Sequence, residues 1–409
     1  MERIVVVGAS LAGLRACESL RTAGYTGTIT LIGAERHEPY DRPPLSKALL
    51  KGEWEPERIR LRKPAELAGL DLDMRLGVVA TGLDTADRAV TVDSGETLAG
   101  DGVIIATGSA PRRLPNQPDF DGVTVLRTLD DSLDLRRRLA DAPRVAVIGA
   151  GFIGLEVAAT ASRSGCTVTV LEGAPAPLMR GLGAQMGEVV TRVHARHGVD
   201  VRCGVQVAGI EGAGGRATGI RLGDGELVPA EVVVMGIGVA PVTQWLDDSG
   251  LELRDGVVCT EALRAAPGIY AAGDCARWVN GLFGETGEEM RVEHWTNAAE
   301  QGAAAATNLL AELAGAAPTP YAPVPFFWSD QFDSRIQFLG RAHGDDDDVQ
   351  LVAGEPDGSF VALYGHAGRL RGVLGVNMPR MVMPYRKLLA ERAPWELALR
   401  HASETQQQI

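Results

Sequence analysis

Two segments of the chain, residues 4–35 and 145–172, repeat the same pattern. Each begins with an uninterrupted apolar run, continues through a glycine-rich turn into residues with helical apolar spacing, and ends in a second apolar run. A glycine suited to ending the helix, Gly24 or Gly165, lies sixteen residues after the first glycine in both copies. Apolar runs without alternating polar residues are typical of parallel strands buried on both faces. The repeat therefore predicts an α/β fold with two strand–helix–strand units.

The turn of each repeat has the glycine spacing that is typical of dinucleotide binding. Residues 149–154 keep all three glycines, whereas residues 8–13 have Ser10 at the middle position. Glycine lets the backbone approach a pyrophosphate closely, and the following helix presents free N–H groups at its N-terminus. One such motif is weak evidence, and ordinary turns without a ligand are the alternative. The duplication favours two dinucleotide sites.

An acidic residue follows the second apolar run of each repeat. Glu172 comes directly after it, and Glu35 lies two residues beyond the equivalent position. A carboxylate here accepts hydrogen bonds from ribose hydroxyls and repels a 2′-phosphate. We therefore expect the second site to prefer NADH to NADPH.

The composition argues against several other classes of protein. The 409 residues include 40 Lys and Arg against 53 Asp and Glu, and the net charge of −13 disfavours nucleic-acid and anionic-membrane partners. The five cysteines are scattered, without metal-ligand or redox-motif spacing, so we expect no metal site. No apolar run reaches the length of a membrane span, and the N-terminus has no signal-peptide pattern. We therefore expect a cytoplasmic protein.

Local patterns predict the later elements. An alanine-rich helix is predicted from Trp295 to Leu313. The composition changes after the proline-rich residues 316–325, where a separate α+β domain is predicted, with a helix from about Pro379 to Arg392. The polar residues 401–409 are predicted to form a mobile tail.

Five further motifs resemble those of the FAD-dependent NADH:ferredoxin reductases, the putidaredoxin-reductase-like family. This family includes the reductase components of aromatic-ring dioxygenase and haem-thiolate monooxygenase systems. The motifs are EPYDRPPLSK (38–47), ATGS (106–109), YAAGDCA (270–276), VEHW (292–295) and PFFWSDQ (325–331). The resemblance extends over essentially the whole chain.

The resemblance implies a glutathione-reductase-like fold with two Rossmann-like βαβ domains and a C-terminal α+β domain. The FAD domain would comprise residues 1–112 and 243–322, the NAD domain 113–242 and the C-terminal domain 323–409. The implied cofactors are FAD and NADH, and the implied partner is an iron–sulfur ferredoxin of the [2Fe-2S] type. Hydride from NADH would pass to FAD, and single electrons would pass to a ferredoxin that feeds a monooxygenase or dioxygenase.

The resemblance also implies which residues contact the cofactors. Those expected at FAD are Gly8, Ser10, Leu11, Ala12, Gly13, Glu35, Arg42, Lys47, Ala80, Ala106, Thr107, Gly108, Arg127, Asp274, Val292, Glu293, His294 and Trp295. Those expected at NADH are Gly149, Gly151, Phe152, Ile153, Gly154, Glu156, Glu172, Arg180 and Gly238.

Two residues are predicted to be catalytic, Lys47 and Glu156. Glu156 lies two residues after Gly154, and we expect its carboxylate to pair with the Lys47 ammonium beside flavin N5. The lysine would stabilise negative charge that develops on the reduced flavin, and the carboxylate would hold the lysine in place. The alternative is that Lys47 only caps a loop while Glu156 faces solvent.

Other functions with the same cofactors remain open. Rubredoxin reductases and monodehydroascorbate reductases would differ in the acceptor that turns over. A protein like apoptosis-inducing factor would bind NADH and act through interactions instead of catalysis. Disulfide reductases are disfavoured, because they need a cysteine beside the flavin and residues 40–47 contain none.

Overall fold

The computed structural model describes residues 2–284, 287–343 and 347–406. The chain divides into two compact units. Unit 1 comprises Met1–Asp41, Ile59–Ala110 and Ala240–Pro325, and unit 2 comprises Arg42–Arg58, Pro111–Val239 and Phe326–Ile409. The boundaries of the three domains expected from the sequence stay a prediction.

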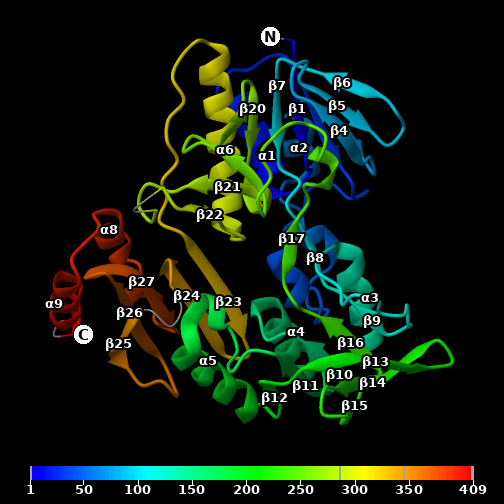
Figure 1. Ribbon diagram of the computed structural model, residues 1–409, viewed down its shortest axis with the longest axis vertical. Coiled ribbons are helices and arrows are strands. Elements are labelled where there is room, and N and C mark those ends of the chain that lie inside the picture. The colour runs from blue at the N-terminus through cyan, green and yellow to red at the C-terminus, as the bar shows by residue number, and fades with distance from the viewer. Residues whose placement is uncertain (1, 285–286, 344–346, 407–409) are drawn as a thin grey trace. The chain divides into compact units, whose positions relative to one another are not determined.

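Unit 1 is built on a six-stranded sheet with the order β19-β20-β7-β1-β2-β3 (Figure 1). All neighbouring strands are parallel except the pair of β19 with β20. Helices α1 and α6 pack together over this sheet. Ile4, Val5 and Val6 of the central strand are fully buried, as expected for a strand covered on both faces. The elements are β1 (Arg3–Val7), α1 (Leu11–Thr22), β2 (Thr28–Gly33), β3 (Leu72–Leu76), β7 (Gly102–Ile105), β19 (Arg264–Ala266), β20 (Ile269–Ala271) and α6 (Trp295–Leu313).

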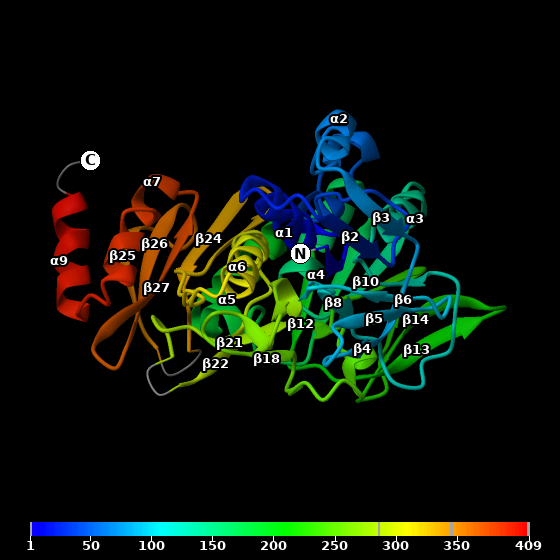
Figure 2. The same ribbon diagram turned by 90° about the horizontal axis from the view of Figure 1, so that it is seen from above.

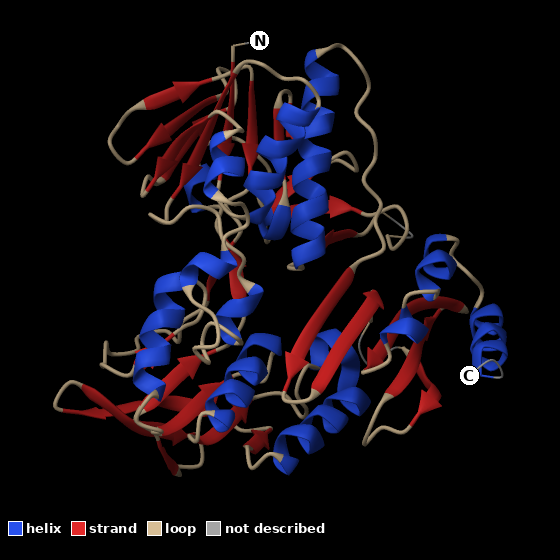
Figure 3. Ribbon diagram, turned by 180° about the vertical axis from the view of Figure 1, so that it is seen from behind, coloured by secondary structure: helices blue, strands red, loops and turns tan. Residues whose placement is uncertain are grey.

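Unit 2 contains a five-stranded parallel sheet with the order β12-β11-β10-β16-β9. Apolar side chains of β10, α4 and α5 form its core, together with side chains from the C-terminal sheet. Helices and parallel strands alternate along the chain from β9 to β12, and Figure 3 draws helices in blue and strands in red. The elements are β9 (Val123–Thr124), α3 (Leu129–Leu139), β10 (Arg144–Ile148), α4 (Phe152–Arg163), β11 (Thr167–Glu172), α5 (Met179–Arg196), β12 (Asp200–Cys203) and β16 (Val232–Met235).

The internal repeat extends further than the sequence indicated. Strands β3-β2-β1-β7 of unit 1 have the same order as β12-β11-β10-β16 of unit 2. Each copy also has a three-stranded antiparallel sheet between its third and fourth parallel strands. These sheets comprise β4 (Ala80–Asp84), β5 (Ala89–Val92) and β6 (Thr97–Ala99), and β13 (Val207–Ala213), β14 (Arg216–Leu222) and β15 (Leu227–Pro229). The predicted α/β fold is confirmed.

The C-terminal part of unit 2 is an antiparallel sheet with the order β23-β24-β27-β26-β25, accompanied by three helices (Figure 2). The prediction of a single helix from about Pro379 to Arg392 is wrong. Pro384, which has no backbone N–H to donate, separates two short helices. The prediction of a mobile tail is also wrong for residues 401–406, which belong to α9, whereas residues 407–409 lie outside the described residues. The elements are β23 (Phe326–Gln331), β24 (Ser334–Gly340), β25 (Asp348–Gly354), β26 (Phe360–His366), β27 (Arg369–Val376), α7 (Pro379–Val382), α8 (Tyr385–Ala390) and α9 (Trp395–Gln406).

Short elements complete the chain. They are η1 (Pro43–Ser46), η2 (Pro56–Ile59), α2 (Pro64–Ala68), β8 (Ser109–Pro111), β17 (Val239–Pro241), η3 (Gln244–Leu246), β18 (Val257–Cys259), η4 (Gly273–Cys275), β21 (Ala276–Val279) and β22 (Glu289–Arg291). Among the helices of the described residues, none has an apolar stretch long enough to cross a lipid bilayer. Within the same residues, His, Cys, Asp and Glu form no group of three that could hold a metal ion.

Candidate functional site: two dinucleotide turns and a buried ion pair

The first glycine of each repeat is required by a close backbone approach. Gly8 has φ +123°, and a Cβ there would lie 2.0 Å from the carbonyl oxygen of Ala106. Gly149 has φ +100°, and a Cβ there would lie 2.4 Å from the carbonyl oxygen of Gly236. In both copies this carbonyl belongs to the turn after the fourth parallel strand. Because a side chain would overlap it, each turn requires glycine for folding.

The middle position of the second turn is different. Gly151 has an ordinary extended backbone, with φ −76°, and the nearest atom to a Cβ there would be the Gly236 carbonyl oxygen at 4.0 Å. The fold therefore does not need glycine at this position. The free space is where a pyrophosphate would approach the backbone, so this turn fits a dinucleotide.

Each turn leads directly into a helix. Leu11 and Ala12 open α1, and Phe152 and Ile153 open α4. The first N–H groups of a helix have no partner inside it, and the helix dipole favours an anion there. These four residues thus lie at helix N-termini that suit a phosphate, and their contacts with FAD and NADH stay a prediction.

The two predicted ribose-binding acids are held by hydrogen bonds. Glu172 is the last residue of β11, and its Oε2 and Oε1 accept the backbone N–H groups of Ala150 at 2.7 Å and Ala174 at 2.8 Å. Glu35 lies just beyond β2 and accepts a hydrogen bond from the Tyr40 hydroxyl. Both carboxylates therefore have a fixed position at the carboxyl end of their sheet.

The structure joins the two residues predicted to be catalytic. Lys47 Nζ lies 2.5 Å from Oε2 of Glu156 and also donates to the Pro43 carbonyl at 3.0 Å. The Ser46 hydroxyl donates to the same carboxylate oxygen at 2.5 Å. Glu156 is only 3% exposed, so the alternative in which it faces solvent is wrong. The role of the pair at a flavin stays a prediction.

Sequence reasoning missed one partner of this carboxylate. The Ser329 hydroxyl donates to the other oxygen, Oε1 of Glu156, at 2.6 Å, and Ser329 is fully buried in β23. Ser329 lies inside the PFFWSDQ motif, one of the five motifs that carry the resemblance to the ferredoxin reductases. The motif was the available signal, but nothing in it indicated a partner 173 residues away in the chain.

Several residues predicted at FAD have well-defined partners within unit 1. Asp274 accepts the Ser109 hydroxyl at 2.8 Å, and the Thr107 hydroxyl donates to the Val242 carbonyl at 2.7 Å. Ala80 lies apart from these residues in sequence and opens strand β4.

The VEHW motif lies at the start of α6. Trp295 Nε1 donates to Asp41 at 2.6 Å, and the Val292 carbonyl accepts the Asn297 amide at 3.0 Å. Burial lowers the pKa of His294 to about 4, so its ring is neutral at pH 7. The neighbouring Glu293 accepts a hydrogen bond from Arg291 at 2.6 Å.

The predicted FAD residues do not all belong to one unit. Arg42, Lys47 and Arg127 belong to unit 2, and the Arg42 guanidinium donates to the Arg127 carbonyl at 2.5 Å. The other predicted FAD residues belong to unit 1, and all predicted NADH residues belong to unit 2. Arg180 is exposed near the start of α5, and Gly238 has open space around a hypothetical Cβ. The assignment of these residues to cofactor contacts stays a prediction.

Comparison with known proteins identifies the class of this chain. Residues 2–302 match the model of the pyridine nucleotide-disulphide oxidoreductases, and residues 326–405 match a reductase C-terminal domain. Rhodocoxin reductase of Rhodococcus erythropolis is 38% identical, over 96% of this chain and 90% of that protein. Putidaredoxin reductase CamA of Pseudomonas putida is 34% identical, over 97% of this chain and 93% of that protein.

The fold has a close counterpart among solved structures. The covalent putidaredoxin reductase–putidaredoxin complex matches with a TM-score of 0.89 and 33% identity, over 96% of this chain and 94% of that chain. These findings confirm the expected resemblance, the oxidoreductase class and the FAD and NADH cofactors of the family. The chain belongs to the pyridine nucleotide-disulphide oxidoreductase family.

Proposed function

We propose that the protein is an NADH-dependent ferredoxin reductase. One observation carries this proposal: the chain builds the same glycine turn twice, each between a buried parallel strand and a helix. Two dinucleotides on one chain have a direct use in hydride transfer from a nicotinamide to a flavin. The names of its relatives, which include reductases of rhodocoxin and putidaredoxin, support a ferredoxin as the acceptor.

Bound FAD would accept a hydride from NADH and release the two electrons one at a time. The chain's own contribution is to hold the two dinucleotides and to place charge. Lys47 supplies a positive charge that favours the negative charge added by hydride transfer, and Glu156 holds that ammonium in one position. Glu172 selects NADH, because its carboxylate repels a 2′-phosphate.

The proposal is tested first by the absorption spectrum of the purified protein and its titration with NADH and NADPH. We expect a flavin spectrum that NADH bleaches at a lower concentration than NADPH. Colourless protein that free FAD does not reconstitute would contradict the proposal.

The acceptor is tested by steady-state turnover. We propose a [2Fe-2S] ferredoxin as the partner, in the cytoplasm, and therefore expect NADH-dependent reduction of such a ferredoxin. Faster turnover with rubredoxin or monodehydroascorbate would identify a different reductase. Slow NADH oxidation without turnover of any acceptor would identify a protein that acts through binding.

The charge of Lys47 is tested with a matched control from the same segment. Lys51 forms an exposed ion pair with Glu53 two residues away. In Lys47→Met, we expect the limiting rate of flavin reduction by NADH to fall about 100- to 1,000-fold, a typical cost for removing one preorganised stabilising group. In Lys51→Met, the rate should stay within about twofold of wild type, because an exposed pair contributes little. Equal rates in the two variants would remove Lys47 from the mechanism.

A further inference from the structure

A chain of buried hydrogen bonds continues from Glu156 into the C-terminal sheet and α5. The Ser329 hydroxyl donates to Glu156 at 2.6 Å, and the Gln331 amide nitrogen donates to the Ser329 oxygen at 3.1 Å. Oε1 of Gln331 then lies 3.0 Å from Nε2 of His194. None of these four side chains is more than 3% exposed, so solvent does not compete for these bonds.

The donors in this chain all point towards the carboxylate. Because the Gln331 nitrogen donates to Ser329, its oxygen faces His194, and this assigns the imidazole proton to Nε2. Burial lowers the pKa of His194 to about 4, so the ring is neutral at pH 7 and has one N–H to donate. Each side chain therefore donates to the next, from His194 through Gln331 and Ser329 to Glu156.

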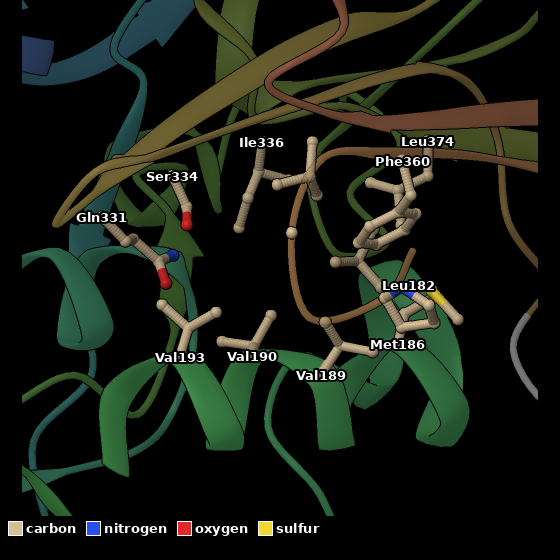
Figure 4. A pocket seen from close by; sticks show the side chains of 13 residues that line it. Leu182, Met186, Val189, Val190, Val193, Gln331, Ser334, Ile336, Phe360 and Leu374 are labelled. Atoms are coloured by element: carbon tan, nitrogen blue, oxygen red, sulfur yellow. The ribbon is translucent and has the colours of Figure 1, made fainter. Parts of the chain in front are cut away.

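This series of hydrogen bonds runs beside an apolar cavity of about 20 Å³ between α5 and the C-terminal sheet, which Gln331 lines. Figure 4 shows Gln331 and Ile336 facing Val190 and Val193 of α5 across it. This volume is far below the several hundred cubic ångströms of a typical ligand site, so the cavity is not a binding pocket. Its apolar lining lowers the local dielectric around Gln331 and strengthens the hydrogen bonds that Gln331 makes.

We propose that Ser329, supported by Gln331 and His194, is a positioning residue that fixes the orientation of Glu156 and thereby the place of the Lys47 ammonium. This inference rests on the proposed role of Lys47 in flavin reduction. The argument is geometric, because the two carboxylate oxygens of Glu156 are held by different parts of unit 2. Ser46 and Lys47 donate to Oε2, whereas β23 supplies the hydroxyl that donates to Oε1.

Removal of one of these donors has a defined effect. Without the Ser329 hydroxyl, the carboxylate can rotate about its last side-chain bond, and Oε2 no longer has a single orientation. The ion pair with Lys47 can persist, but the ammonium then samples several positions. The rate of the chemical step should therefore fall, while the affinity for NADH, which depends on the separate glycine turn, should stay the same.

Stopped-flow reduction of the FAD-loaded protein by NADH tests this inference. In Ser329→Ala, we expect the limiting rate of flavin reduction to fall about tenfold, with the Kd for NADH within about twofold of wild type, the usual scale for a group that orients a functional residue. Gln331→Met should show a smaller effect in the same direction. Ser329 then keeps its hydrogen bond to Glu156 and loses only the one that it accepts from Gln331.

Tyr364→Phe is the matched control. The Tyr364 hydroxyl is buried in β26 and donates to the Leu182 carbonyl of α5 at 2.8 Å. This substitution also removes one buried hydrogen bond between the C-terminal sheet and α5, but it does not touch the chain of bonds to Glu156. The limiting rate of Tyr364→Phe should equal that of wild type, even where its thermal stability falls as much as that of Ser329→Ala.

A double-mutant cycle separates this inference from the proposed function. If Ser329 acts through Lys47, the substitution Ser329→Ala should have no further effect on the rate in Lys47→Met protein. The same tenfold loss in both backgrounds would overturn the inference, as would a wild-type rate in Ser329→Ala when Lys47→Met is slow. A wild-type rate in Lys47→Met would instead overturn the proposed role of the lysine.

Discussion

Gly151 offers the most selective test of the second dinucleotide site, because the fold does not need glycine there. In Gly151→Ala, the new methyl group would meet only the Gly236 carbonyl oxygen, at 4.0 Å, and the backbone φ of −76° suits alanine. The free energy of unfolding should therefore stay within about 0.5 kcal/mol of wild type. The methyl group would nevertheless occupy the space through which a pyrophosphate approaches the turn.

The expected loss of NADH affinity follows from the size of a methyl group. Overpacking a fitted site by one methylene costs about 1 to 3 kcal/mol. This corresponds to an increase of about 5- to 150-fold in the Kd for NADH. Urea denaturation measures the stability, and the dependence of the flavin reduction rate on NADH concentration measures the affinity.

The control is Gly149→Ala in the same turn. Its backbone has φ +100°, and its Cβ would overlap the Gly236 carbonyl oxygen at 2.4 Å. This variant should lose more than about 2 kcal/mol of stability, since strain and overlap add. The reasoning is refuted if Gly151→Ala binds NADH as tightly as wild type, or if it unfolds as readily as Gly149→Ala.

Three further predictions concern histidine, nucleotide selectivity and FAD retention. Burial lowers the pKa of His194 and His294 to about 4, so the unfolded chain binds more protons than the folded one below pH 6.5. The contribution of each neutral histidine to stability is thus complete near pH 7.5, and the free energy of unfolding should fall by about 2 kcal/mol per histidine between there and pH 5. Urea denaturation at both pH values measures this loss, which should be about 2 kcal/mol smaller in His194→Gln, and an unchanged loss would contradict the assignment. Glu172→Gln should lower the NADH:NADPH preference about tenfold in flavin reduction, because the amide no longer repels a 2′-phosphate, and an unchanged ratio would argue against this role. Tyr40→Phe removes the hydroxyl that holds Glu35 and should raise the Kd for FAD about tenfold when apoprotein is reconstituted, whereas equal affinity would show that this bond is dispensable.

The local patterns of the sequence were sufficient for much of the fold. The apolar runs in residues 4–35 and 145–172 become central parallel strands, and the predicted helix from Trp295 to Leu313 has the same bounds in the structure. These features depend on hydrophobic spacing and on glycine, both of which act over a few residues.

The errors lie where tertiary packing overrides local composition. Residues 401–406 look polar, but they continue α9, whose Ala398 and Ala402 are buried. The helix predicted from about Pro379 to Arg392 ignored Pro384, which has no backbone N–H to continue the helical hydrogen bonds.

The candidate site was predicted only in part for the same reason. The Lys47–Glu156 pair was expected from two motifs, but Ser329 and His194 carry no local signal of their partners. His194 and Gln331 are 137 residues apart in the sequence, and only the packing of α5 against the C-terminal sheet brings them within hydrogen-bond distance. A histidine within an amphipathic helix gives no indication of which side chain will cover it.

Both repeats have a three-stranded antiparallel sheet at the same place in the chain, between the third and the fourth parallel strand. Since the inserted strands and the glycine turns coincide, the backbone that the two repeats share does not by itself distinguish one dinucleotide from the other. Discrimination between a flavin and a nicotinamide carrier then depends on side chains that differ between the repeats, such as Ser10 at the position that Gly151 occupies in the second turn. Exchanging these two residues would measure how much of that selectivity depends on this one position.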